Sequence, residues 1–351
     1  MDFTPYLEMM IRQKASDLFL SAGSPVRIKI EGRLRDIGEK VYSPEMCREA
    51  VCSLMREEQI ADYDDKRELD FAVGLEGKGR FRINAFHQRG TPGMVIRYLS
   101  NRILTCEELG LPEVLKTIVM HKRGIVLMVG STGSGKSTTL AAMIDHRNKN
   151  SSGHILTIED PVEYLHPHQG CIINQREVGV DTLSYAAALK SSLREAPDVI
   201  LIGEIRTRET MEAAIELSGT GHLAISTLHA NNAHQAMQRI INMFPQDLHK
   251  TLYLDLSLNM RAIISQRLVR TVDSKRAAAI EILVNTPHIA DLIREGRVEE
   301  VQEAMATSEE GGMITFDNAL LALYRDGRIS LEECIANADS AANLEAKINF
   351  G

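Results

Sequence analysis

The chain contains no tryptophan, and aromatic residues make up only 5% of its 351 residues. Proteins that bind single-stranded nucleic acid stack the bases on aromatic side chains. The sequence also lacks an excess of positive charge, because its net charge is −8 at pH 7 and its pI is near 5.8. Nucleic-acid binders usually carry basic patches that neutralise phosphates. We therefore expect no nucleic-acid partner.

Cysteine is scarce as well, and its spacing excludes two kinds of site. The five cysteines contain no CxxC pair; they are Cys47, Cys52, Cys106, Cys171 and Cys334. Structural zinc needs clustered thiolates or imidazoles. A disulfide framework needs paired cysteines in an oxidising compartment. We expect reduced thiols and no structural zinc.

Long hydrophobic runs are missing too. The most apolar segments, 124–130 and 199–203, have the length of single strands, far short of the length that spans a bilayer. The first ten residues show no basic segment followed by an apolar core, which a secretory signal would have. These observations predict a cytoplasmic location.

The length favours two domains, because 351 residues exceed what one core usually holds. Residues 1–100 predict a small α+β domain, residues 101–112 a linker, and residues 113–351 a larger domain. In the first domain Ser43 and Pro44 predict a helix start. Apolar residues alternate with Arg80 and Arg82, which predicts a strand with both arginines on its outer face.

From residue 113 short apolar strands alternate with helical segments. The strands are expected at 125–129, 154–158, 199–202 and 223–227. This rhythm predicts an α/β fold with a mostly parallel, doubly wound sheet. From about residue 250 to the end we expect mainly helices.

The strongest motif follows the first of these strands and fits G-x-x-x-x-G-K-[ST]. It reads Gly130, Ser131, Thr132, Gly133, Ser134, Gly135, Lys136 and Ser137, and Thr138 continues into a helix. Glycines let the backbone wrap phosphate, and the helix N-terminus favours the anion. Lys136 is expected to reach the β- and γ-phosphates of ATP, and the Ser137 hydroxyl to bind Mg²⁺.

Two acidic segments follow strands that end at the same sheet edge. Glu163 comes after the strand at 154–158 and is a candidate to orient or deprotonate the attacking water. Glu204 ends the strand at 199–202, and Gly203 stands where a metal-binding Asp is often found. Glu204 is then expected to serve Mg²⁺ or the water itself. The alternative for Glu163 is a loop of solvated acids.

Two histidines, His222 and His229, bracket the strand at 223–227. A lone histidine is more often structural, but two beside a nucleotide site suggest γ-phosphate sensing or a hydrogen-bond relay.

Together, the segments 130–137, 157–164, 198–204 and 220–230 resemble, in order and spacing, the secretion ATPase superfamily of type II secretion and type IV pili. The start at 15–23 and the helix residues Ile289, Leu292, Ile293, Arg294 and Glu295 resemble the pilus retraction ATPases within it. Several substitutions, including Phe19, Ala196 and Thr207, resemble the PilU branch rather than the PilT branch.

The resemblance implies an N-terminal PAS-like domain and a C-terminal RecA-like ATPase domain, with six copies in a ring and ATP bound between the two domains. It implies that Arg80, Arg82 and Arg97 approach the nucleotide. A solvated basic strand face is the alternative for Arg80. It further implies an accessory retraction motor at the cytoplasmic face of the inner membrane. Its partners would be a PilT-like ATPase and the pilus platform protein.

Two other functions stay open. The chain would instead be a regulatory module with little activity of its own if its polar tail, 337–351, docks on a partner ring; a frayed terminus is the alternative for this tail. An RNA or DNA helicase is the third hypothesis, which the acidic pI and few aromatics oppose.

Overall fold

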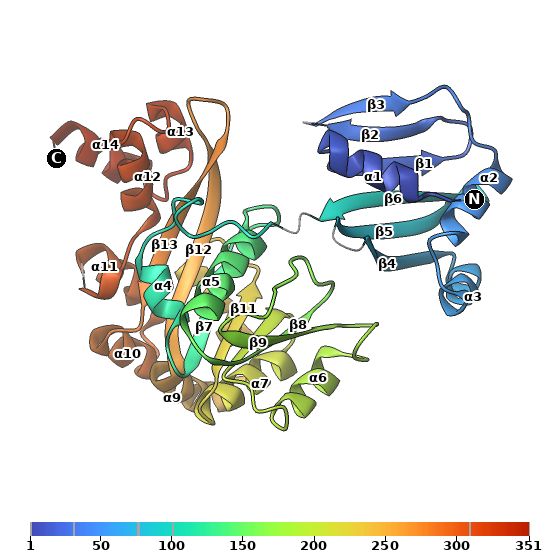
Figure 1. The fold of residues 1–351 in the computed structure, drawn as a ribbon. Helices are drawn as coiled ribbons and strands as arrows, with labels where there is room; N and C mark the ends of the chain where they lie inside the picture. Colours follow the sequence, from blue (N-terminus) through green and yellow to red (C-terminus); the bar gives the residue numbers. More distant parts are fainter. Residues whose placement is uncertain (1, 31, 76–77, 100–101, 309, 351) are drawn as a thin grey trace. The chain divides into compact units, whose positions relative to one another are not determined.

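The computed structural model describes residues 2–30, 32–75, 78–99, 102–308 and 310–350. The chain divides into two compact units, Met1–Arg102 and Ile103–Gly351 (Figure 1). The expected domain boundary at 100–101 lies outside the described residues. Residues 103–112, which we expected to form most of a linker, belong to the second unit.

The first unit is an antiparallel sheet with helices against one face (Figure 1). Its sheet has the strand order β3-β2-β1-β6-β5-β4. The elements are α1 (Thr4–Gln13), β1 (Asp17–Ser21), β2 (Val26–Ile30), β3 (Arg33–Ile37), α2 (Pro44–Cys52), α3 (Glu57–Lys66), β4 (Glu68–Leu75), β5 (Gly79–Gln88) and β6 (Thr91–Leu99). As expected, Ser43 caps α2 by accepting from the backbone N–H of Met46, and Pro44 is its first residue.

Alternation along the strands separates the two faces of this sheet. Phe81, Ile83 and Ala85 of β5 are fully buried in the core of the unit, whereas Arg80 and Arg82, which alternate with them, are partly exposed. Arg82 pairs directly with Arg97 of β6. Since directly paired residues point to the same side of a sheet, one face packs on the helices and the other carries the arginines.

The second unit is built on a seven-stranded sheet with helices on both faces (Figure 1). Up to residue 259 its elements are α4 (Val114–Val119), β7 (Gly124–Val129), α5 (Lys136–Asn150), β8 (Gly153–Glu159), β9 (Cys171–Glu177), α6 (Tyr185–Ser192), β10 (Val199–Glu204), α7 (Arg208–Gly219), β11 (Leu223–Leu228), α8 (Ala233–Asn242), η1 (Gln246–Leu248) and α9 (His249–Asn259). The remaining elements are β12 (Met260–Arg270), β13 (Arg276–Val284), α10 (Pro287–Arg294), η2 (Val298–Glu300), α11 (Val301–Thr307), η3 (Glu310–Gly312), α12 (Phe316–Arg325), α13 (Leu331–Ala336) and α14 (Ala341–Phe350).

The strand order is β13-β12-β7-β11-β10-β8-β9, and all neighbours are parallel except β12 and β13. This confirms the predicted α/β class. All six residues of β7 are buried, as expected for a central parallel strand. The carboxyl ends of β7, β8, β10 and β11 meet at one edge of the sheet, where open α/β sheets bind ligands.

The C-terminal part is mainly helical, as predicted, but it contains one hairpin that we did not predict, and the alternative of a frayed tail is wrong. Residues 260–284 are not helical but form the long β12–β13 hairpin, which extends the sheet past β7. The tail also packs: Leu344 of α14 is fully buried with Phe316 and Leu320 of α12. In the described ranges we find no helix that is both long and apolar enough to span a bilayer.

Candidate nucleotide site

The loop at 130–137 joins the buried strand β7 to helix α5 and has the geometry of a phosphate cradle. Gly130, Gly133 and Gly135 have φ of 149°, 79° and 87°, which favours glycine at each position. A Cβ at Gly133 would meet nothing within 4 Å, so this part of the loop is open. Helix α5 begins without a side-chain cap, which leaves its first N–H groups to a ligand.

The underside of the loop rests on Gln266, a buried residue of β12. Its side-chain Nε2 donates to the Ser134 carbonyl oxygen over 2.8 Å, and its Oε1 accepts from the Thr139 hydroxyl over 2.7 Å. A Cβ at Gly135 would lie 2.7 Å from Gln266 Nε2. Gln266 therefore fixes both the loop and the first turn of α5.

Lys136 lies at the mouth of the loop. Its Nζ donates to the carbonyl oxygens of Gly130 and Ser131, both over 2.8 Å. Burial lowers the pKa of Lys136, and the negative charges of Glu204 and Glu163 partly oppose that shift. The lysine and both predicted carboxylates thus share one electrostatic environment.

Glu204, at the end of β10, uses both carboxylate oxygens. One oxygen pairs with Arg206 Nε over 2.7 Å and the other lies 3.1 Å from His229 Nε2. The Glu204 side chain is 15% exposed and the His229 side chain 40% exposed. A carboxylate and an imidazole in contact beside the phosphate loop form a pair that can orient water or a phosphate oxygen. Arg206 was not among the residues predicted for the site.

The structure explains why Gly203 replaces an acidic residue. A Cβ at Gly203 would lie 2.6 Å from the Tyr185 hydroxyl and 3.2 Å from the Ile158 carbonyl oxygen. Any larger residue would have to displace Tyr185 or strand β8. A metal-binding acid therefore does not fit at this position.

Glu163 is exposed on the loop that leaves β8, after the cis Asp160–Pro161 bond. The adjacent Tyr164 hydroxyl lies 2.8 Å from the Thr138 hydroxyl, which brings this loop to the start of α5. Glu159, four residues earlier, is only partly exposed. Burial raises the pKa of Glu159, although a hydrogen bond from Thr157 opposes the shift. Of the two glutamates, Glu163 is the one that is open to a ligand.

His222 is at the wrong end of its strand for the role we predicted. Leu223 pairs with Gly124 at the start of β7, and Leu228 pairs with Val129 at the end. Six residues of strand, about 20 Å, separate His222 from the phosphate loop. The His222 ring contacts Thr220 and the Leu217 carbonyl oxygen, both at 3.1 Å. The prediction that His222 and His229 act together on the nucleotide of this loop is therefore wrong.

Clefts flank the phosphate loop on two sides. A cleft of about 830 Å³ adjoins the helix side; its lining includes Gly135, Thr138, Thr139, Leu109, Leu111, Leu268, Arg270, Arg276 and Ala278. A second cleft, of about 360 Å³, lies where the loop begins, between Gly130, Ser131, His229 and Arg239. The site therefore has one side with several apolar residues and one polar side that contains the histidine.

The three predicted arginines belong to the first unit and lie on one face of its sheet. Arg97 Nε donates to Asp17 Oδ1 over 2.9 Å, and the Arg97 side chain is 64% exposed. Arg82 is its direct cross-strand neighbour, and Arg80 lies two residues earlier on the same strand. The arrangement is a basic cluster that an anion can reach.

The donors at the site suit a hard cation bound together with phosphate. The Ser137 hydroxyl and the Glu204 carboxylate offer oxygen ligands, which Mg²⁺ prefers. The described residues contain no group of three or more His, Cys, Asp or Glu side chains placed to hold a metal. Two protein ligands fit Mg²⁺, because this ion usually keeps several waters and takes further oxygens from phosphates.

Comparison with known proteins places these features in a family. Residues 2–344 match the family model described as type II/IV secretion system protein. The chain is 53% identical to the type IV pilus ATPase PilU of Pseudomonas aeruginosa, over 100% of this chain and 92% of that protein. It is 41% identical to the type IV pilus retraction ATPase PilT of the same organism, over 98% of this chain and 100% of that protein.

A solved structure supports the same assignment. The crystal structure of the pilus retraction motor PilT with bound ADP aligns with a TM-score of 0.92 at 37% identity, over 98% of this chain and 99% of that one.

Proposed function

The chain belongs to the type II/IV secretion system protein family, and we propose that it is an ATP-hydrolysing motor subunit that drives type IV pilus retraction. The observation that carries the proposal is the phosphate loop with Lys136 at its mouth and the Glu204–His229 pair beside it. The relatives named as pilus ATPases, which match the chain over nearly its whole length, support the same function.

The glycine conformations and the uncapped start of α5 supply the phosphate site. Backbone N–H groups of the loop would donate to the β- and γ-phosphates, and Lys136 would exchange the carbonyl oxygens of Gly130 and Ser131 for phosphate oxygens. Because Lys136 and Ser137 open α5, the nucleoside would extend past Thr138 into the 830 Å³ cleft. Several of its lining residues are apolar, which suits an adenine ring.

The γ-phosphate end would then face the smaller, polar cleft with His229. We assign Glu163 as the group that orients or deprotonates the attacking water. Glu204 and His229 would hold the water or a γ-phosphate oxygen through their contact. The Arg80, Arg82 and Arg97 cluster would supply positive charge to the phosphates.

Mg²⁺, held by the Ser137 hydroxyl and the Glu204 carboxylate, would neutralise charge on the β- and γ-phosphates. In the present structure each carboxylate oxygen of Glu204 already has a partner, Arg206 for one and His229 for the other. Binding the ion through Glu204 would therefore require one of these partners to give way.

At the level of the assembly, we propose a homo-hexameric ring at the cytoplasmic face of the inner membrane. It would act on the platform protein of the pilus machine together with a PilT-like ATPase. The identity to PilU, higher than that to PilT, supports the accessory role. Sequential hydrolysis around the ring would move the first unit of one subunit against the second unit of the next.

Replacing Lys136 tests the catalytic part directly. We expect Lys136→Ala to lower kcat/KM for Mg-ATP by about 100-fold or more, because the substitution removes the cation that stabilises the transferred phosphate. Turnover of the purified full-length chain is the measurement. Lys190→Ala, at an exposed position of α6, is the matched control and should leave turnover unchanged. An unaltered rate in folded Lys136→Ala protein would refute the proposed chemistry.

A further inference from the structure

His229 stands on a four-residue loop, 229–232, which leads from β11 into α8. Each end of this loop is tied by hydrogen bonds. Arg239 donates to the His229 carbonyl oxygen over 2.7 Å, and Gln235 accepts from the Asn231 N–H over 3.2 Å. The Asn232 side chain caps α8 by accepting from the Gln235 N–H over 2.9 Å. All three of these contacts are made by α8 and its own cap, so they order the loop relative to the helix only.

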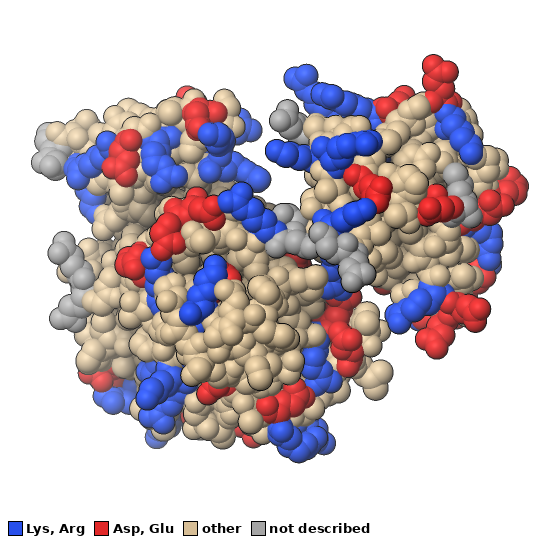
Figure 2. Space-filling model, in the orientation of Figure 1, with Lys and Arg blue, Asp and Glu red and all other residues tan. Residues whose placement is uncertain are grey.

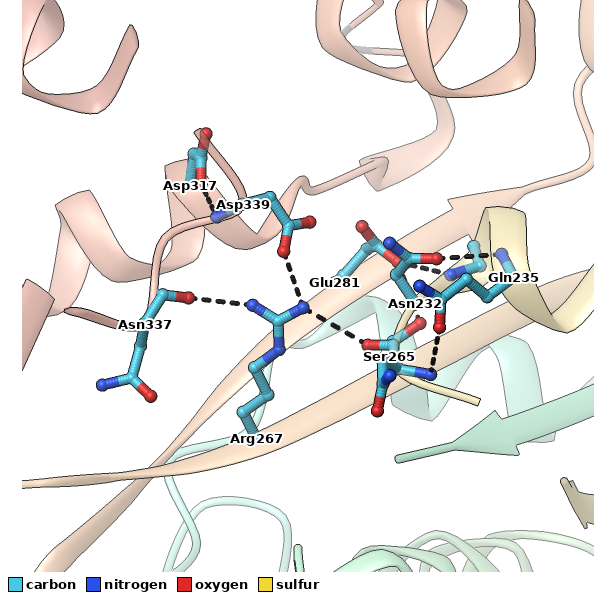
Figure 3. A network of polar contacts seen from close by, with 10 residues as sticks. Asn232, Gln235, Ser265, Arg267, Glu281, Asp317, Asn337 and Asp339 are labelled. Carbon is cyan, nitrogen blue, oxygen red and sulfur yellow. Dashed lines mark hydrogen bonds and ion pairs between the residues drawn. The ribbon is translucent and has the colours of Figure 1, made fainter. Parts of the chain in front are cut away.

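The loop follows directly from β11 at its first residue, and at its other end, beside α8, a hydrogen-bonded link to the sheet is made by Glu281. This residue lies on β13, and its side chain is buried. Its Oε1 accepts from the Ala233 N–H, at the first residue of α8, over 2.7 Å, and from the Ser265 hydroxyl of β12 over 2.9 Å. Figure 3 shows Glu281 and Ser265 beside the start of α8, close to Asn232 and Gln235.

Arg267 of β12 makes a second, outer link. Its guanidinium reaches the Asn231 carbonyl oxygen at 3.4 Å, the Asn337 carbonyl oxygen at 2.8 Å and Asp339 at 2.6 Å. Figure 3 shows Arg267 between these residues of the C-terminal segment and the start of α8. The Asn231 contact is long and lies on an exposed face. The hydrogen bond from the Ala233 N–H to Glu281 is shorter and buried, so it restrains the loop more strongly than the Arg267 contact does.

Burying a carboxyl group costs free energy unless the group is fully hydrogen-bonded or paired with a charge. Desolvation raises the pKa of Glu281 to about 7, against the lowering effect of the Ala233 and Ser265 hydrogen bonds and of Arg267. Asp339 adds a smaller upward effect. An apolar residue of the same size on β13 would avoid this cost but would leave the Ala233 N–H without its acceptor.

We propose that Glu281 is a positioning residue for ATP turnover: it holds the start of α8, and with it His229, at the distance that lets His229 contact Glu204. The proposal rests on the role given above to His229 and Glu204. Glu281 lies behind α8 and acts through the backbone of the loop, so it affects the rate of the chemical step and leaves nucleotide binding at the phosphate loop intact.

Turnover of the full-length chain tests the proposal. We expect Glu281→Ala to lower kcat about 10- to 100-fold, the effect of a small misplacement of a catalytic group, with KM for ATP unchanged. Glu281→Gln keeps an acceptor oxygen and should keep most of kcat. Asn285→Ala is the control, since Asn285, directly after β13, donates to the carbonyl oxygens of Ser257 in α9 and Met260 at the start of β12, away from the loop. The Asn285→Ala variant should lower stability but not kcat.

Coupling to His229 separates positioning from general damage. In a His229→Ala background the Glu281→Ala change should lower kcat no further, because contacts that act through one group are not additive. Equal loss in both backgrounds, or a wild-type kcat for either single variant, would overturn the proposal. Lys136→Ala, measured in parallel, reports separately on the proposed ATPase chemistry.

A second variant covers the case in which Glu281→Ala does not fold. Ala233→Pro removes the N–H from which Glu281 accepts, and proline fits the first position of a helix. The preceding Asn232 already has extended backbone angles, which proline requires of its neighbour. We expect this variant to reproduce the fall in kcat, and a folded Ala233→Pro protein with wild-type kcat would contradict the proposal.

Discussion

At the scale of single residues, the phosphate loop depends on a partner far away in the sequence. Gln266 hydrogen-bonds Ser134 and Thr139 with its two side-chain atoms. Both bonds are buried, so removing the side chain would leave a carbonyl and a hydroxyl without partners. Such groups cost about 1–3 kcal/mol each when buried and unpaired. The loop would become less well ordered for phosphate.

We therefore predict that Gln266→Ala weakens ADP binding. The expected increase in Kd is about 10-fold, which corresponds to roughly 1.4 kcal/mol. Titration with a fluorescent ADP analogue measures it. Gln238→Ala, which loses only a contact with Glu299 at the surface of α8, should leave Kd unchanged. An unaltered Kd for folded Gln266→Ala protein would show that the loop is ordered without this residue.

The sequence revealed those site residues that form contiguous motifs and missed those that support them. Lys136 and Glu204 could be predicted because a strand, a loop and a helix follow each other in a recognisable order. Gln266 and Glu281 lie on the β12–β13 hairpin, more than 120 residues after the loop. Only the pairing of β12 with β7 brings them to the site. No local pattern signals that pairing.

At the scale of elements, strand β10 is packed so closely at its end that only glycine fits. A Cβ at Gly203 would contact the Tyr185 hydroxyl of α6 at 2.6 Å and the backbone of β8 at 3.2 Å. Contacts below 3.0 Å force a shift of one partner. The end of β10 that carries Glu204 is thus held between α6 and β8.

Gly203→Ala should therefore destabilise the protein by about 1–3 kcal/mol, the usual cost of overpacking. Urea unfolding followed by circular dichroism is the appropriate measurement, since the chain has no tryptophan. Tyr185→Phe in the same variant removes the hydroxyl and should recover part of the loss. Gly219→Ala, where a Cβ meets nothing within 4 Å, is the control and should not destabilise. Equal stability of the Gly203 and Gly219 variants would contradict this account.

Among the strands of the second unit, those in the centre of the sheet were predicted from the sequence and the β12–β13 hairpin was not. The strands β7, β8, β10 and β11 were predicted because each is a short apolar run between helical segments. The hairpin β12–β13 was missed because its strands carry polar residues such as Ser265, Gln266 and Glu281 inside the core. These break the apolar run that marks a buried strand. The buried polar side chains, to which we assign supporting roles at the site, are thus the reason why the sequence did not predict the hairpin.

At the scale of the whole molecule, the two units carry different surfaces. Figure 2 shows Lys and Arg side chains gathered over one part of the first unit, and both signs of charge interspersed on the second. Arg27, Lys29, Arg33 and Arg35 of strands β2 and β3 contribute basic groups to the first unit. In the ring that we propose, the uncovered sheet face with Arg82 and Arg97 would be the surface that meets bound nucleotide.

We propose that ATP turnover at Lys136 drives pilus retraction in an accessory role. The decisive experiment places Lys136→Ala in the native chain and images fluorescent pili that retract under load. We predict that pili still retract, but with less force than in the parent cells. Retraction with unchanged frequency and force would contradict the claim, and complete loss of retraction would contradict the accessory role.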